Sequence, residues 1–186
     1  KEKLKELETD FPKGIHYKYS YDVSKFLDAS LEQVIHTIRD AFFLVALVVF
    51  LFLGDWRSTL IPIIAVPISL IGAFFVFQMF GLSINLITLF ALVLAIGVVV
   101  DNAIVVVEAV HAKMEEDPHL TPYKATQKAV GELSGAIIAI TMVMISVFVP
   151  IAFMGGPVGV FYRQFSITMA SSILISGVVA LTLTPV

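Results

Sequence analysis

The chain has 186 residues, of which 58% are hydrophobic and 15% charged, and its formal net charge is −3. Soluble domains are about 45–50% apolar, so this composition excludes an ordinary soluble domain and favours a membrane protein. The small net charge indicates no nucleic-acid partner, and a chain without cysteine forms no disulfides.

The N-terminal residues 1–28 are polar and charged, and we predict that they are a small α/β remnant of a soluble subdomain. Leu4 and Leu7 mark one face of a short helix, and residues 15–20 alternate as a half-buried strand does. One helix and one strand bury too little surface to fold alone, so other residues must complete the subdomain. Residues 30–33 (Ser-Leu-Glu-Gln) fit a capping box and are expected to start the first membrane helix.

The following residues, 29–186, contain apolar segments, each close to the roughly 20 residues that cross a hydrocarbon core of about 30 Å. We therefore predict a mainly α, polytopic membrane helix bundle. Five transmembrane helices are expected at about residues 34–53, 58–80, 84–107, 133–153 and 164–184. Ser83 is expected to cap the third of them, and Thr121-Pro122 has the pattern of a cap followed by a first helical residue.

Short turns join most of these helices, so sequential neighbours are expected to be antiparallel. The one longer connection, 109–131, is polar. Its lysines and Arg57 in the first turn place both connections on the cytoplasmic side. His111 and His119 have no partners at metal-ligand spacing and are expected to be solvated.

Asp101 is the most informative residue, because residues 58–100 before it include no Asp, Glu, Lys or Arg. An Asp at the centre of a membrane helix costs about 2.5–3.5 kcal/mol on translocon scales, so such an acid is a candidate proton or ion site. The alternative is a carboxylate that only hydrogen-bonds to a neighbouring helix. Gly97, one turn earlier on the same face, either allows close approach of a partner helix or is a neutral glycine without a packing role. Glu108, two turns later, is expected at a solvated helix end.

The sequence contains no nucleophile elbow, phosphate loop or metal motif. We therefore expect no catalytic residue, no metal and no cofactor, and a protein that is not an enzyme.

Motifs that run through the chain in unbroken order point to one family. They are Thr59–Pro62, Ala65–Pro67, Gly81–Asn85, Leu94–Gly97, Val100–Glu108, Val147–Pro150, Tyr162–Thr168 and Leu183–Pro185. This series closely resembles the resistance–nodulation–division (RND) exporters, in the hydrophobe/amphiphile efflux branch of acriflavine-resistance-type multidrug pumps. The resemblance implies that 1–28 ends the first periplasmic porter region, and that the five apolar segments are transmembrane helices two to six of twelve.

The resemblance further implies a homotrimeric proton/drug antiporter of the bacterial inner membrane, with its N-terminal segment in the periplasm. Its partners would be the lipid bilayer, the second transmembrane half of the same chain, a periplasmic adaptor, an outer-membrane channel and small amphiphilic substrates. Asp101 matches the first of two adjacent acids that bind protons in the best-known members. Asn102 replaces the second, and it can hydrogen-bond but cannot carry a proton.

Two other hypotheses remain open at this stage. The helices could form a sensing or translocation-assisting module of RND-like fold, or a fragment that is inactive when isolated.

Overall fold

The computed structural model describes residues 22–156 and 158–184, together with Lys3, Leu7, Phe11, Pro12, Gly14 and His16. The helices within these ranges are α2 (Val23–Leu53), α3 (Trp56–Phe80), α4 (Leu86–Glu116), α5 (Pro122–Ala152) and α6 (Gly159–Thr182). All five are long and apolar enough to cross a membrane. The prediction of a polytopic helix bundle is therefore confirmed.

The predicted α/β remnant at the N-terminus is not supported, because the described residues contain no strand. The expected strand at 15–20 lies outside the described residues except for His16, and Leu4 of the expected helix lies outside them too.

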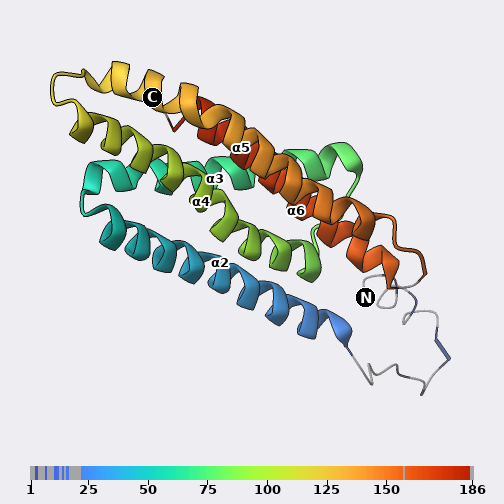
Figure 1. Ribbon diagram of the computed structural model, residues 1–186. Coiled ribbons are helices and arrows are strands. Elements are labelled where there is room, and N and C mark those ends of the chain that lie inside the picture. The colour runs from blue at the N-terminus through green and yellow to red at the C-terminus, as the bar shows by residue number, and fades with distance from the viewer. Residues whose placement is uncertain are drawn as a thin grey trace.

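The helices alternate in direction, so the connections gather at two ends of the bundle (Figure 1). The start of α3, directly after the α2–α3 turn, meets the last part of α4, where His111 Nε2 lies 2.9 Å from Ser58 Oγ. At the other end Asn85, before α4, donates a hydrogen bond to Gln164 of α6. Both short turns that flank α3 contain a glycine in the left-handed region, Gly54 (φ 65°) and Gly81 (φ 62°), a conformation that favours glycine.

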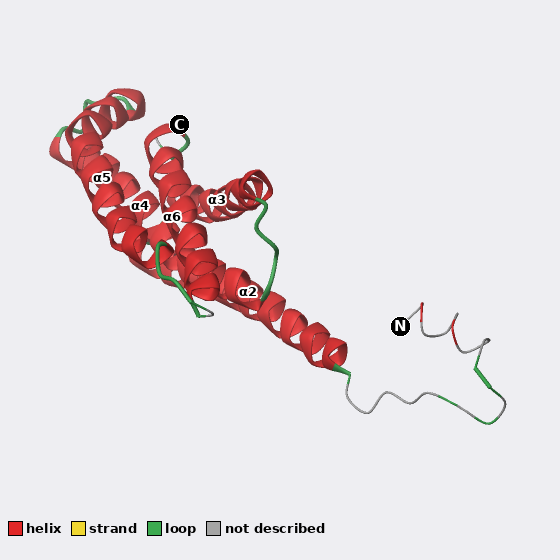
Figure 2. Cartoon of the chain, turned by 90° about the vertical axis from the view of Figure 1, so that its right-hand side faces the viewer, coloured by secondary structure: helices red, strands yellow, loops and turns green. Residues whose placement is uncertain are grey.

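α4 and α6 form the centre of the bundle. In the most apolar stretch of each, 56% of residues are buried, against 6% in α2 and 11% in α5. Among the described elements α2 packs only against α3 and α4, and α5 lies on the opposite side against α4 and α6 (Figures 1 and 2). The part of α4 that contains Gly97 and Asp101 borders a cavity whose described lining residues outside α4 all come from α2.

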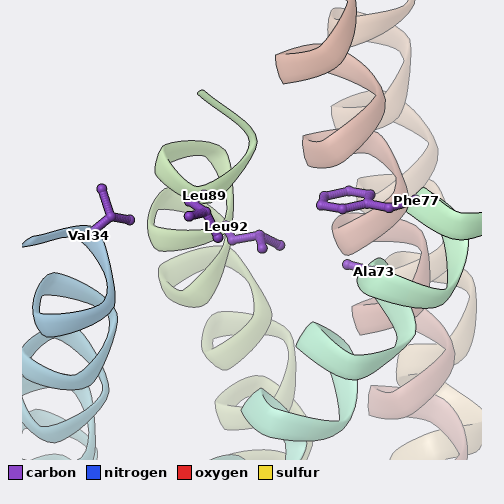
Figure 3. Close-up of a cluster of buried hydrophobic side chains, with 5 residues drawn as sticks. All are labelled: Val34, Ala73, Phe77, Leu89 and Leu92. Atoms are coloured by element: carbon purple, nitrogen blue, oxygen red, sulfur yellow. The ribbon is translucent and has the colours of Figure 1, made fainter. Parts of the chain in front are cut away.

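The buried contacts of α2, α3 and α4 meet in a cluster near the end of α3. Leu89 and Leu92 of α4 lie between Val34 of α2 on one side and Ala73 and Phe77 of α3 on the other (Figure 3). Lipid tails are as apolar as these side chains, so in a membrane the cluster stabilises the bundle through van der Waals packing and not through exclusion of water.

Close helix contacts occur where residues are small. A Cβ added at Gly72 of α3 would lie 2.9 Å from the Ile175 side chain of α6. At Gly177 of α6 it would lie 2.7 Å from Thr141 Oγ1 of α5. These two glycines let α3 and α5 approach the central helix α6.

Helix ends differ from the sequence predictions in three places. α2 starts at Val23, and not in the predicted capping box at 30–33. Asp22 caps it by accepting a hydrogen bond from the Ser24 backbone N–H at 3.2 Å. Nothing in the intervening sequence breaks the helix, because it contains no glycine or proline.

The cap of α4 is Asn85 and not Ser83. Its Oδ1 accepts from the backbone N–H groups of Ile87 (2.9 Å) and Thr88 (3.1 Å), and Thr88 Oγ1 accepts the Asn85 backbone N–H at 2.9 Å. This reciprocal pair is a capping box.

The polar connection expected at 109–131 is mostly helical. α4 continues to Glu116 and α5 begins at Pro122, which leaves only residues 117–121 outside the two helices. Lys113 explains the extension, because its Nζ lies 3.2 Å from Glu116 on its own helix and 3.1 Å from Glu132 on α5. Thr121 and Pro122 start α5 as predicted, although the Thr121 side chain makes no capping bond.

Candidate functional site

Asp101 lies at the midpoint of α4, fifteen residues from Leu86 and fifteen from Glu116. At 1.5 Å per residue, each end of the helix is about 22 Å away. Turns and loops at the helix ends therefore do not bring water to this carboxylate. A proton that reaches it must travel along the helix surface.

The Asp101 side chain points to the open side of α4, where it is exposed. It lines a cavity of about 220 Å³ together with Gly97 and Ile104 of α4 and Val45 and Val48 of α2. Within the described part of the chain, no side chain hydrogen-bonds to this carboxylate or forms an ion pair with it. The reading of Asp101 as a packing acid held by a neighbouring helix thus finds no support among these residues.

Asn102 points the other way and is only 8% exposed. Its Nδ2 donates a 3.0 Å hydrogen bond to Ser176 Oγ of α6, and Ser176 Oγ donates to the Val99 carbonyl oxygen at 3.2 Å. Consecutive residues on an α-helix are rotated by about 100°, and this rotation separates the two environments. Asp101 and Asn102 are adjacent in sequence but have different neighbours among the described residues.

Gly97 does not bring two described helices together. It is exposed, and a Cβ added there would meet no atom within 4 Å. The close approaches in this bundle are at Gly72 and Gly177. Gly97 therefore leaves room beside Asp101 on the open face, and a helix that packs closely against it must come from outside the described residues.

A polar network at the end of α4 was not expected from the sequence. His111 is half-buried, and its Nε2 lies 2.9 Å from Ser58 Oγ, 53 positions earlier in the chain. Ser58 Oγ donates to Asp55 Oδ2 at 3.0 Å. The prediction that His111 is solvated is wrong, because its partner Ser58 lies in the first turn of α3. The local pattern of Asp55 three residues before Ser58 signals a helix cap, but nothing in it points to His111.

Glu108 is exposed, as expected for a solvated position. It shares a cavity of about 170 Å³ with Ile104 and His111 of α4 and with Phe52 and Leu53 of α2. His119 is exposed as well, as predicted. Among the residues that the structure describes, no group of three His, Asp or Glu side chains is arranged to hold a metal ion.

Asp101 is thus the one carboxylate among the residues that line the cavity it shares with Gly97, and the other lining residues are apolar. Over residues 1–186 the sequence matches the family model described as the AcrB/AcrD/AcrF family. The chain belongs to this family. The resemblance to RND efflux pumps is therefore confirmed.

Curated relatives in this family are efflux proteins. The chain is 50% identical over 185 residues to the multidrug export protein AcrF of Escherichia coli K12 and 47% identical to the toluene efflux pump membrane transporter TtgE of Pseudomonas putida. It is 46% identical to the multidrug resistance protein MdtF of Escherichia coli K12. In each case 100% of this chain is covered, and it spans 18% of the relative's length.

Proposed function

We propose that this chain is part of a proton-driven efflux transporter of the bacterial inner membrane, and that Asp101 couples proton movement to export. The observation that carries the proposal is the Asp101 carboxylate at the midpoint of α4, exposed on the open face and without a partner among the described residues. Family membership supplies the context, because related proteins carry the names of multidrug and toluene efflux pumps. Hydrophobic or amphiphilic compounds are therefore the proposed substrates.

Proton binding changes the charge of the open face of α4. An ionised Asp101 favours water or a cation beside it, whereas the protonated form tolerates apolar neighbours. A helix from the rest of the transporter that packs on this face would thus interact with α4 with a different free energy when Asp101 is ionised and when it is protonated. Such a difference in interaction free energy is what a proton needs in order to shift a conformational equilibrium. Asn102 cannot titrate, and we assign it to holding α4 against α6 through Ser176.

The remaining parts of the machine are proposed from the family context. The second transmembrane half would cover the open face, and three copies would assemble with a periplasmic adaptor and an outer-membrane channel. Residues 1–28 would end a periplasmic porter subdomain, with the α3–α4 and α5–α6 connections on the same side. Because the chain spans 18% of its relatives, we expect no transport by these residues alone.

The test is Asp101→Asn in the full-length transporter, reconstituted in vesicles with a pH-sensitive dye inside. Asn keeps size and hydrogen bonding but cannot carry a proton, so both substrate export and substrate-linked proton flux should fall to the level of empty vesicles. Glu115→Gln is the matched control, because Glu115 is an exposed carboxylate near the end of the same helix, and it should transport normally. Wild-type proton flux in Asp101→Asn, at equal protein level, would refute the proposal.

A further inference from the structure

The network of Asp55, Ser58 and His111 defines how the His111 ring is protonated. A serine hydroxyl has one hydrogen to donate. Ser58 Oγ lies 3.0 Å from Asp55 Oδ2, and the Ser58 backbone N–H donates to the same oxygen at 3.2 Å. The Ser58 hydrogen is therefore directed at the carboxylate, and Ser58 Oγ must accept from His111 Nε2–H. The ring either carries its single proton on Nε2 or is doubly protonated.

The second ring nitrogen, Nδ1, is free to exchange protons. No described residue hydrogen-bonds to it. His111 lines two cavities, of about 170 Å³ with Glu108 and of about 190 Å³ with Met114 and Pro122. Each is large enough for several water molecules, which occupy about 30 Å³ apiece in the liquid. The ring is thus fixed on one side and borders space for water on the other.

Two neighbouring cavities lie along α4 between His111 and Asp101. The cavity with Glu108 and the cavity with Asp101 share Ile104 as a lining residue, so they lie next to each other on the surface of α4 that faces α2. Glu108 lies seven residues from Asp101, about 10 Å along the helix, and His111 lies about 15 Å from it. This stretch is too long for direct transfer, so water in the two neighbouring cavities would have to carry the proton across it.

We propose that His111 passes protons between water at the α2–α3 end of the bundle and the groove that holds Asp101. The proposal rests on the proposed function of Asp101. In each passage Nδ1 accepts a proton from water on one side and gives it up to water on the other, so the ring returns to its starting state. Ser58 and Asp55 are positioning residues, because they hold the ring through Nε2 and do not touch the transferred proton.

The charged surroundings favour this role. From the α3 side, His111 meets the Asp55 carboxylate through Ser58, and on its own helix it shares a cavity with Glu108. The α2 residues beside it are Phe52 and Leu53, and the residues of α5 are Pro122 and Thr126, none of which titrates. Both facing charged side chains are carboxylates, and no lysine or arginine lines either cavity.

The experiment compares His111→Gln, Ser58→Ala and wild type in the full-length transporter, with export measured against pH in vesicles. Gln can still donate to Ser58 but cannot titrate. We expect His111→Gln to slow export at least about tenfold and to flatten its pH dependence, with an unchanged KM for substrate. In His111→Ala, added imidazole should restore export. Ser58→Ala should slow export but leave the pH dependence of export as it is in wild type. His119→Gln, in the exposed connection, is the matched control and should change nothing.

Two results would overturn the proposal. One is a wild-type rate and pH profile for His111→Gln. The other is a His111→Gln variant that exports more slowly but with a pH profile of unchanged shape, together with a His111→Ala variant that added imidazole does not restore. That pair of results would indicate a purely structural role for His111. Asp101→Asn, measured in parallel, separates the two proposals. Retained export in that variant refutes the function of Asp101, whereas its loss together with a normal His111→Gln refutes only the role of His111.

Discussion

Asn102 donates a hydrogen bond to Ser176, and this bond ties the middle of α4 to α6 on the side away from Asp101. Asn102 Nδ2 and Ser176 Oγ are 3.0 Å apart, and both side chains are buried. Two adjacent polar residues of α4 therefore serve different purposes. One holds the central pair of helices together, and the other faces the open groove.

Substitutions at Asn102 should separate packing from proton exchange. Asn102→Ala breaks the bond to Ser176, which in membrane proteins is worth about 0.6 kcal/mol on average, so export should weaken while its pH dependence still reports one group. Asn102→Asp adds a second titratable group beside Asp101, and the pH profile should then show two coupled steps. Export rate against pH in vesicles is the measurement. Two coupled titrations already present in wild type, with no change in Asn102→Asp, would contradict this assignment.

Gly177→Ala should destabilise the bundle. The added Cβ would lie 2.7 Å from Thr141 Oγ1 and 3.1 Å from Thr141 Cγ2, so rotation of the threonine cannot relieve both contacts. Overpacking of this kind costs about 1–3 kcal/mol, and the Tm of the purified transporter should fall. Thr141→Ala in the same protein should recover part of the loss. Gly131→Ala, where an added Cβ meets nothing within 4 Å, serves as control. Equal Tm values for Gly177→Ala and Gly131→Ala would disprove the clash.

The connections should sort in pairs across the membrane. The α2–α3 turn and the α4–α5 connection lie at one end of the bundle, and the α3–α4 turn and the α5–α6 connection lie at the other end (Figure 1). We expect the first pair to face the cytoplasm. Single cysteines at the exposed positions His119 and Ser83, in a cysteine-free full-length transporter, test this with an impermeant thiol reagent. Only Ser83→Cys should react in intact spheroplasts, and reaction of His119→Cys there would reverse the topology.

The acid stability of the α2–α3 turn should depend on Ser58. The pKa of the Asp55 carboxyl lies below the reference value of 3.8. The main cause is the hydrogen bond that the Ser58 hydroxyl donates to it, and the second cause is the hydrogen bond from the Ser58 backbone N–H. The ionised carboxylate therefore stabilises the fold fully above pH 3.8, and this contribution is lost as the pH falls through the lower folded-state pKa.

Ser58→Ala removes the main cause of the lowered pKa, so loss of helical circular dichroism on acidification should begin at a higher pH than in wild type. Asp55→Asn has no carboxylate to protonate at this site. In that background the Ser58→Ala substitution should not shift the acid transition further. An identical acid midpoint for Ser58→Ala and wild type would rule out this role of Ser58.

The sequence by itself determined the membrane class, the positions of the five apolar segments and the isolation of Asp101. These features follow from composition and from runs of neighbouring residues, which decide whether a segment is stable in lipid. Its motifs also indicated the family, which the comparison confirmed along the whole chain.

The tertiary structure alone decided which partners these residues have. The sequence around Asp101 and Asn102 does not show that Asn102 faces α6 whereas Asp101 lies beside α2, because both faces of α4 are apolar. The expected solvation of His111 failed since its partner, Ser58, is 53 positions away. The expected loop at 109–131 failed for a similar reason, because Lys113 is held by Glu132 of the next helix. Local sequence determines whether a segment can be a helix, whereas contacts between distant segments determine where the helix ends and what each face meets.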